Sequence, residues 1–164
     1  MDLRRKNQEL EISKEIVMIE KTIKSLQSLC ERIPSLLEKI SDEDFSEKPA
    51  PGKWSKKEIL GHLIDSATNN HHRFVRTQFE NKPFIAYDQN EWNRASRYHE
   101  MDKSHLIRFW TLYNLHLLEI MRRIPETDLE RELMVHEKEP LKLGYVINDY
   151  LVHLEHHLHQ LVEY

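Results

Sequence analysis

Glycine is nearly absent from this sequence, with 3 residues in 164, or about 2% against an average of about 7%. Gly52, Gly61 and Gly144 lie far apart along the chain. No glycine-rich loop that cradles phosphates can therefore form, because P-loops and dinucleotide-binding turns need several glycines within a few residues. The sequence excludes these two classes of nucleotide-binding protein.

Cysteine and long apolar runs are also scarce. The single cysteine, Cys30, excludes an intrachain disulfide and a CxxC motif, and is typical of a reducing compartment. No run of 18 apolar residues occurs, and the first residues lead into no apolar stretch of the kind found in signal peptides. We therefore expect a cytoplasmic protein that does not associate with a membrane.

Positive charge is not in excess. The chain has 24 Lys and Arg against 28 Asp and Glu, a net charge of −4. Because nucleic-acid binding relies on cationic groups that neutralise phosphates, we expect no nucleic-acid partner. A length of 164 residues favours one domain over residues 1–164, large enough for a core without disulfides.

Apolar residues recur at alternating steps of three and four, which is the period of an amphipathic helix. This pattern predicts four helices, over residues 12–40, from Ser55 to before Pro83, over 102–124 and over 143–162. Ser55 and Glu58 form a capping-box pattern, and Pro34 predicts a kink or break near Ile33. Residues 41–53, 81–101 and 126–142 lack this period, and no strand pattern stands out. The predicted fold class is all-α, an antiparallel four-helix bundle.

Histidine is abundant, with 11 residues, and three of these have the spacing of a metal site. His153 and His157 lie one turn apart on one face of the last helix, so both can reach one ion. His62 lies among core residues of the second helix, beside Gly61, which would allow close approach of a neighbour. Three imidazoles leave a fourth position open, as in catalytic sites. Hydrogen-bonded packing of these histidines is the alternative.

The remaining histidines and Cys30 have simpler interpretations. His71 and His72 are adjacent and cannot share an ion comfortably, so we expect structural or solvent-facing roles for them. The same expectation covers His99, His105, His116 and His136, while His156 and His159 point toward solvent or a partner. Cys30 lies on the apolar stripe of the first helix and is expected to be buried.

Three stretches of the sequence resemble one family. PGKWSKKEILGHLIDSATNNHHRF resembles the second-helix signature of the DinB/YfiT-like superfamily, in which a Trp-Ser/Thr turn precedes a helix with a metal-binding histidine. HLEHHLHQ resembles the final-helix motif of that superfamily, and PFIAYDQNEWN is similar to the long loop of its YfiT branch. The resemblance covers roughly residues 10–164.

This resemblance implies a four-helix bundle in up-down-down-up order. It also implies one divalent ion, zinc or nickel, held by His62, His153 and His157. Members of the family are described as metal-dependent hydrolases, and relatives include bacillithiol and other low-molecular-weight thiol S-transferases. They are often homodimers, and some have no known activity, so membership does not determine the function.

Three hypotheses for the function follow. The first is a hydrolase in which the metal activates water against a small molecule. The second is a thiol S-transferase of the bacillithiol type, in which the same open position holds a thiolate. The third is a non-catalytic, metal-stabilised helical binding or scaffold module.

No HExxH glutamate is present. Asp65 and Gln160 are candidates for orienting an imidazole from outside the metal site.

Substrate contacts are expected from the long segment over residues 81–101, because an extended connection in a small domain is often functional. Tyr87, Asn90, Trp92 and Arg94 offer aromatic, polar and cationic groups there. The alternative is that Trp92 and Tyr87 only close one end of the bundle.

Overall fold

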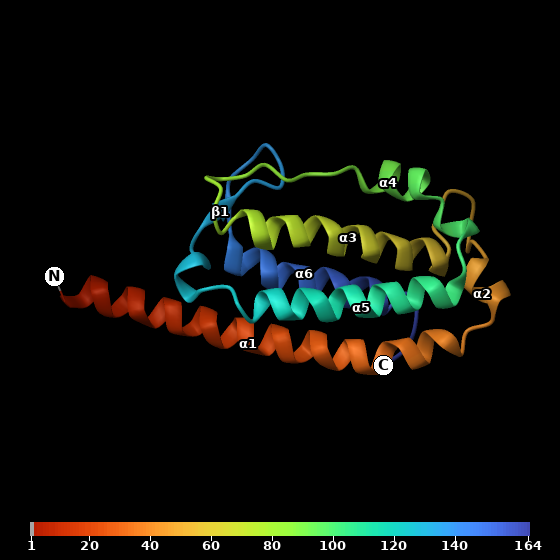
Figure 1. The fold of residues 1–164 in the computed structure, drawn as a ribbon, viewed down its shortest axis with the longest axis horizontal. Coiled ribbons are helices and arrows are strands. Elements are labelled where there is room, and N and C mark those ends of the chain that lie inside the picture. The colour runs from red at the N-terminus through yellow and green to blue at the C-terminus, as the bar shows by residue number, and fades with distance from the viewer. Residues whose placement is uncertain (1) are drawn as a thin grey trace.

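The computed structural model describes residues 2–164, with side chains from Ile16 onward, and it contains a bundle of four long helices (Figure 1). These helices are α1 (Asp2–Glu38), α3 (Lys56–Arg76), α5 (Lys103–Met121) and α6 (Leu143–Leu158). In the described part of the chain, no helix is long and apolar enough to cross a membrane. The predicted all-α four-helix bundle is confirmed.

The helices follow the up-down-down-up order that the family resemblance implies. In Figure 1, α1 and α6 run in one direction, and α3 and α5 run in the other. Because α3 and α5 are parallel, the chain between them must return along the whole bundle. Residues 77–102, which we call the crossover segment, make this return. Not every pair of packed helices is antiparallel. Helix α3 packs on α6, which runs in the opposite direction, and also on α5, which runs in the same direction.

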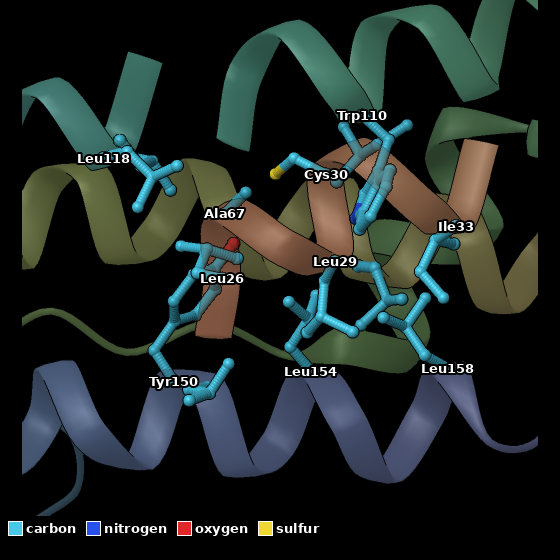
Figure 2. Packing of buried hydrophobic residues seen from close by; sticks show 14 of the residues in the cluster. Leu26, Leu29, Cys30, Ile33, Ala67, Trp110, Leu118, Tyr150, Leu154 and Leu158 are labelled. Carbon is cyan, nitrogen blue, oxygen red and sulfur yellow. The ribbon is translucent and has the colours of Figure 1, made fainter. Parts of the chain in front are cut away.

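The core lies between the four helices and is built from the predicted apolar stripes. Figure 2 shows Leu26 and Ile33 of α1 facing Trp110 of α5 and Leu154 and Leu158 of α6. All five of these side chains are fully buried. Cys30 is buried in the same cluster, and burial raises the pKa of its thiol to about 12. Cys30 is therefore an unreactive apolar side chain of the core, as expected.

Of the kink or break predicted near Ile33, the break does not occur. Helix α1 continues through Pro34 to Glu38, although a proline inside a helix removes one backbone hydrogen bond. Ile33 and Leu37, on either side of Pro34, are both fully buried. Their packing offsets the lost hydrogen bond and keeps the helix intact.

Two segments predicted as loops contain short helices. Helix α2 (Asp42–Ser46) begins after Ser41, whose hydroxyl accepts from the Asp44 backbone N–H. In the crossover segment, α4 (Gln89–Ser96) begins after Asp88, which accepts from two backbone N–H groups, and a 3-10 turn follows at Tyr98–Glu100. These helices are too short to show an apolar period, which is why the sequence pattern missed them.

Short elements also occur before the last predicted helix, and that helix is shorter than predicted. Residues 126–142 contain a 3-10 turn at Glu126–Asp128 and two short antiparallel strands, β1 (Glu132–Leu133) and β2 (Leu141–Lys142). A bridge between Phe84 and Met134 joins this region to the crossover segment. Helix α6 ends at Leu158 and not at residue 162.

Candidate metal centre

Helices α3 and α6 bring three histidines together toward one end of the bundle, near the start of α3 and the end of α6. Helix α3 begins with the predicted capping box, in which the Ser55 hydroxyl and the Glu58 carboxylate each accept from the other residue's backbone N–H. His62 follows one turn later. His153 and His157 lie one turn apart on α6, which packs directly on α3. The predicted meeting of residue 62 with residues 153 and 157 is therefore present in the fold.

The three rings lie close together, and the separation of His62 and His153 matches that of two ligands on a shared ion. The Nε2 atoms of His62 and His153 are 3.2 Å apart, and candidate ligand atoms of all three residues lie within 4.8 Å of one another. Two nitrogens bound tetrahedrally to one ion, each at 2.0–2.1 Å, would be about 3.3 Å apart. The ring centroids are separated by 4.7–5.1 Å.

Burial keeps the three imidazoles neutral. His62 has no exposed surface, and its desolvation, with the neighbouring His153 and His157, lowers its pKa to about 3. Burial and the charge of His157 lower the pKa of His153 to about 4, and burial lowers that of His157. Neutral imidazoles have the free lone pairs that a metal ligand needs.

Two residues beside the histidines were not selected by the sequence pattern. The indole ring of Trp54 lies 5.1 Å from the ring of His62. The Ser66 hydroxyl is 3.5 Å from Nδ1 of His153. Ser66 follows His62 by four residues and therefore shares its face of α3, so this spacing could have identified it. Trp54 precedes the helix, and only the fold shows that it folds back on His62.

Asp65 and Gln160 both lie near the site. Asp65 Oδ1 accepts a 2.5 Å hydrogen bond from the Tyr98 hydroxyl, and Gln160 Nε2 lies 3.1 Å from Nε2 of His156. Among the described residues, Asp65 Oδ2 is buried without a hydrogen-bond partner. Burial raises the pKa of the Asp65 carboxyl to about 6. Asp65 has no hydrogen bond to a site imidazole, because Tyr98 of the crossover segment is its partner. A side-chain hydrogen bond with Gln160 acts on His157 and raises its pKa, against the larger lowering by burial.

The four residues considered for substrate contact divide into two pairs. Asn90 and Arg94, on α4, line a cleft of about 680 Å³ together with Trp54 and residues of the segment over 46–58. Tyr87 and Trp92 pack edge to face, with ring centroids 5.4 Å apart. Tyr87 is half-buried and Trp92 is 39% exposed. Trp54 connects the cleft to the histidines, because it lines the cleft and contacts His62.

Comparison with known proteins gives one family. A family model described as the DinB superfamily matches residues 26–161. A protein of Oceanobacillus iheyensis, named as a candidate metal-dependent hydrolase, is 25% identical over 87% of this chain and 83% of its own length. YfiT of Bacillus subtilis, which carries the same description, is 23% identical over 88% of this chain and 82% of its own length.

Two solved structures show the same fold. The structure of YfiT from Bacillus subtilis, described as having an unusual four-helix bundle topology, superposes with a TM-score of 0.79 at 21% identity over 87% of this chain and 83% of that one. A mycothiol-dependent maleylpyruvate isomerase superposes with a TM-score of 0.71 at 11% identity, covering 87% of this chain and 60% of that one.

Proposed function

The chain belongs to the DinB superfamily, and on that premise we propose that it is a metal-dependent enzyme of the hydrolase type that acts on a small molecule. The observation that carries the proposal is the convergence of His62, His153 and His157 from two helices. Two similar proteins, which are named as candidate metal-dependent hydrolases, also support the proposal.

His62, His153 and His157 are suited to hold the ion. A hydrogen bond between the Nε2 atoms of His62 and His153 would also account for their 3.2 Å separation. It would not explain the third ring, since Nδ1 of His157 is buried and has no hydrogen-bond partner among the described residues. An unpaired buried nitrogen is costly, and a metal ligand bond would remove that cost. Three imidazoles suit zinc or nickel.

A divalent ion, when bound, supplies a Lewis acid that activates a nucleophile near neutral pH. The residues of this chain orient and enclose it. With Nε2 of His153 toward the ion, its Nδ1–H donates to Ser66 Oγ, which holds the ring in place. The Trp54 ring covers His62 and excludes water from that side. Burial of His62 keeps the imidazole unprotonated down to a pH far below neutral.

Substrate contact is proposed for Asn90 and Arg94, with Tyr87 and Trp92 supporting the segment that carries them. The cleft beside Trp54 is of the size that small-molecule sites have, about 300–1,000 Å³. Arg94 is exposed and paired with Glu91 at 2.5 Å, so its guanidinium can exchange that partner for a substrate group. A small molecule in this cleft would lie against Trp54, next to the histidines.

A thiol S-transferase is the second candidate function. It is favoured by one observation, namely that a solved protein with this fold is named as mycothiol-dependent. An ion with an open position activates a thiol as well as water, so the same three histidines serve either reaction. In that case a low-molecular-weight thiol is the second substrate.

The test compares two neighbouring histidines of α6 in tag-free protein. We expect His157→Ala to weaken metal affinity by more than tenfold, because even the loss of a residue behind a ligand costs about 10–100-fold. His156→Ala is the matched control, since His156 is exposed and pairs with Gln160. Equal loss in both variants, measured by elemental analysis and calorimetry, would show diffuse surface binding and contradict the proposal.

Activity assays then separate the three functions. Metal-loaded protein is incubated with small esters, amides and alkylating electrophiles, with and without an added thiol. Turnover with water alone supports the hydrolase, and turnover only with thiol supports the S-transferase. A cobalt-substituted protein whose absorption spectrum does not respond to azide has no exchangeable position, and that result would identify a structural metal.

A further inference from the structure

A second pair of imidazoles lies on the other side of α3. His71 follows His62 by nine residues, which is 2.5 turns, so it projects from the opposite face of the helix. Its ring centroid is 5.3 Å from that of His116 on α5, and the two rings meet edge to face at 69°. We expected both histidines to be structural or solvated, because nothing in their sequence spacing of 45 residues relates them.

The separation of these rings fits two ligands on one ion. An imidazole centre lies about 3.1 Å from a metal bound to its nitrogen at 2.0–2.1 Å, so two rings at a tetrahedral angle have centres about 5.1 Å apart. The ring centroids of His62, His153 and His157, which we call the first site, are 4.7–5.1 Å apart. His72 is 6.5 Å from His71, which exceeds even the linear arrangement, so the fit concerns His71 and His116 alone.

Tyr113 is placed to orient the ring of His71 through a hydrogen bond, as residues next to metal-bound histidines commonly do. Its hydroxyl oxygen is 3.0 Å from Nδ1 of His71. When Nδ1–H donates to this oxygen, Nε2 carries the free lone pair, which is the tautomer that metal-bound histidines adopt. The Tyr113 ring also stacks on that of His116, with centroids 6.4 Å apart and planes at 10°. One side chain therefore positions both imidazoles.

We propose that His71 and His116 form a second site for a divalent transition-metal ion, with Tyr113 as its positioning residue. Imidazole ligands suit Cu²⁺, Zn²⁺ and Ni²⁺, with Cu²⁺ bound most tightly. His71 is half-buried and His116 is exposed, so an ion reaches them from solvent and water completes its coordination. The ion links α3 to α5, whereas the first site links α3 to α6.

The experiment uses tag-free, full-length protein in which only one histidine of the first site remains, either His62→Ala with His157→Ala or His153→Ala with His157→Ala, titrated with Cu²⁺ and Zn²⁺ by calorimetry. Two backgrounds are needed because His62 is fully buried and its loss affects folding. We expect one remaining equivalent of metal, lost on adding His71→Ala or His116→Ala. Adding Tyr113→Phe should lower the affinity of this remaining site for the metal about tenfold.

His105→Ala is the matched control, because His105 is an exposed histidine of the same helix α5 that stacks on Phe109. It should leave the remaining equivalent unchanged, and electron paramagnetic resonance of the Cu²⁺ protein should show two nitrogen ligands. Absence of the equivalent, its persistence in His116→Ala, or equal loss in His105→Ala would overturn the proposal. Each outcome is independent of activity at the first site.

Discussion

Burial, more than contact with other charges, controls the ionisation of the residues around the first site. Desolvation is the largest cause of the lowered pKa of His62 and His153 and of the raised pKa of Asp65. All three groups are consequently stabilised in their uncharged forms. The site therefore presents neutral donor atoms to a cation near neutral pH, and acidification opposes metal binding.

The stability of the metal-free protein is expected to fall on acidification. The folded-state pKa values of His62 and His153, about 3 and 4, lie below their ordinary value of 6.5. Below pH 6.5 the unfolded chain therefore binds protons that the folded chain does not, and each such proton lowers the free energy of unfolding by about 1.4 kcal/mol per pH unit. Denaturant unfolding between pH 7 and pH 5, with chelator present, measures this slope.

Asp65 acts in the opposite direction over part of this range. Its raised pKa, about 6, contributes stability at low pH that is lost as the pH rises toward 6. Because the effect of one carboxyl is set against that of two imidazoles, the net stability should still fall on acidification. The variant His153→Gln should reduce the slope by at most one proton. A flat stability between pH 7 and pH 5 in the metal-free protein would contradict burial of neutral imidazoles.

At the scale of elements, the crossover segment is what distinguishes this bundle. Because α3 and α5 run in the same direction, residues 77–102 must return along α3, and specific contacts hold them there. The Asn93 amide donates to the Glu58 backbone oxygen at 2.7 Å, and Tyr98 donates to Asp65. Arg73 donates to the Ile85 backbone oxygen. These contacts place α4 and its cleft beside Trp54.

Gly61 is expected to be required for this placement. A Cβ at residue 61 would lie 2.2 Å from ring carbons of Tyr98, so Gly61→Ala forces the ring out of position. Overpacking of this kind costs about 1–3 kcal/mol, and the helix-propensity gain of about 1 kcal/mol offsets it only in part. Thermal unfolding should show a lower melting temperature than the wild type.

A double-mutant cycle isolates the clash. In a Tyr98→Ala background the ring is absent, so Gly61→Ala should become neutral or stabilising through helix propensity alone. Destabilisation of the same size in both backgrounds would mean that the contact between Gly61 and Tyr98 does not govern the effect.

At the scale of the whole molecule, the first site joins parts of the chain that are 91 residues apart. An ion that binds only the folded protein stabilises it by about 4 kcal/mol when the free ion is at a thousand times its Kd. That corresponds to about 8–16 °C in melting temperature for a protein of this size. Removal of the ion by a chelator should therefore lower the melting temperature by this amount.

The matched control for chelation is His153→Gln, which puts an amide in place of the imidazole. Residue 153 is partly exposed, so the polar amide is tolerated there. Its melting temperature should fall less on chelation than that of the wild type, because a weaker site contributes less stability. Wild-type protein loaded with zinc or nickel that melts at the same temperature with and without chelator would contradict coupling of the metal to the fold.

The amphipathic period, the capping box of Ser55 and Glu58, and the spacing of His153 and His157 are local properties. The sequence by itself therefore determined the four helices, the start of α3 and the face of α6 that carries two imidazoles. The family resemblance added the helix order, and the spacing had already selected His62. Short helices such as α4 escaped because their ends depend on caps and contacts and not on a repeated apolar stripe.

Only the tertiary structure decided which partners meet across the bundle. Asp65 pairs with Tyr98 and not with an imidazole, Trp54 covers His62, and His116 reaches His71, because packing of separate elements brings these side chains together. Pro34 remains inside α1 for the same reason, since buried neighbours outweigh a local preference. Local periodicity is a property of the chain, whereas each of these contacts depends on the position of a second element.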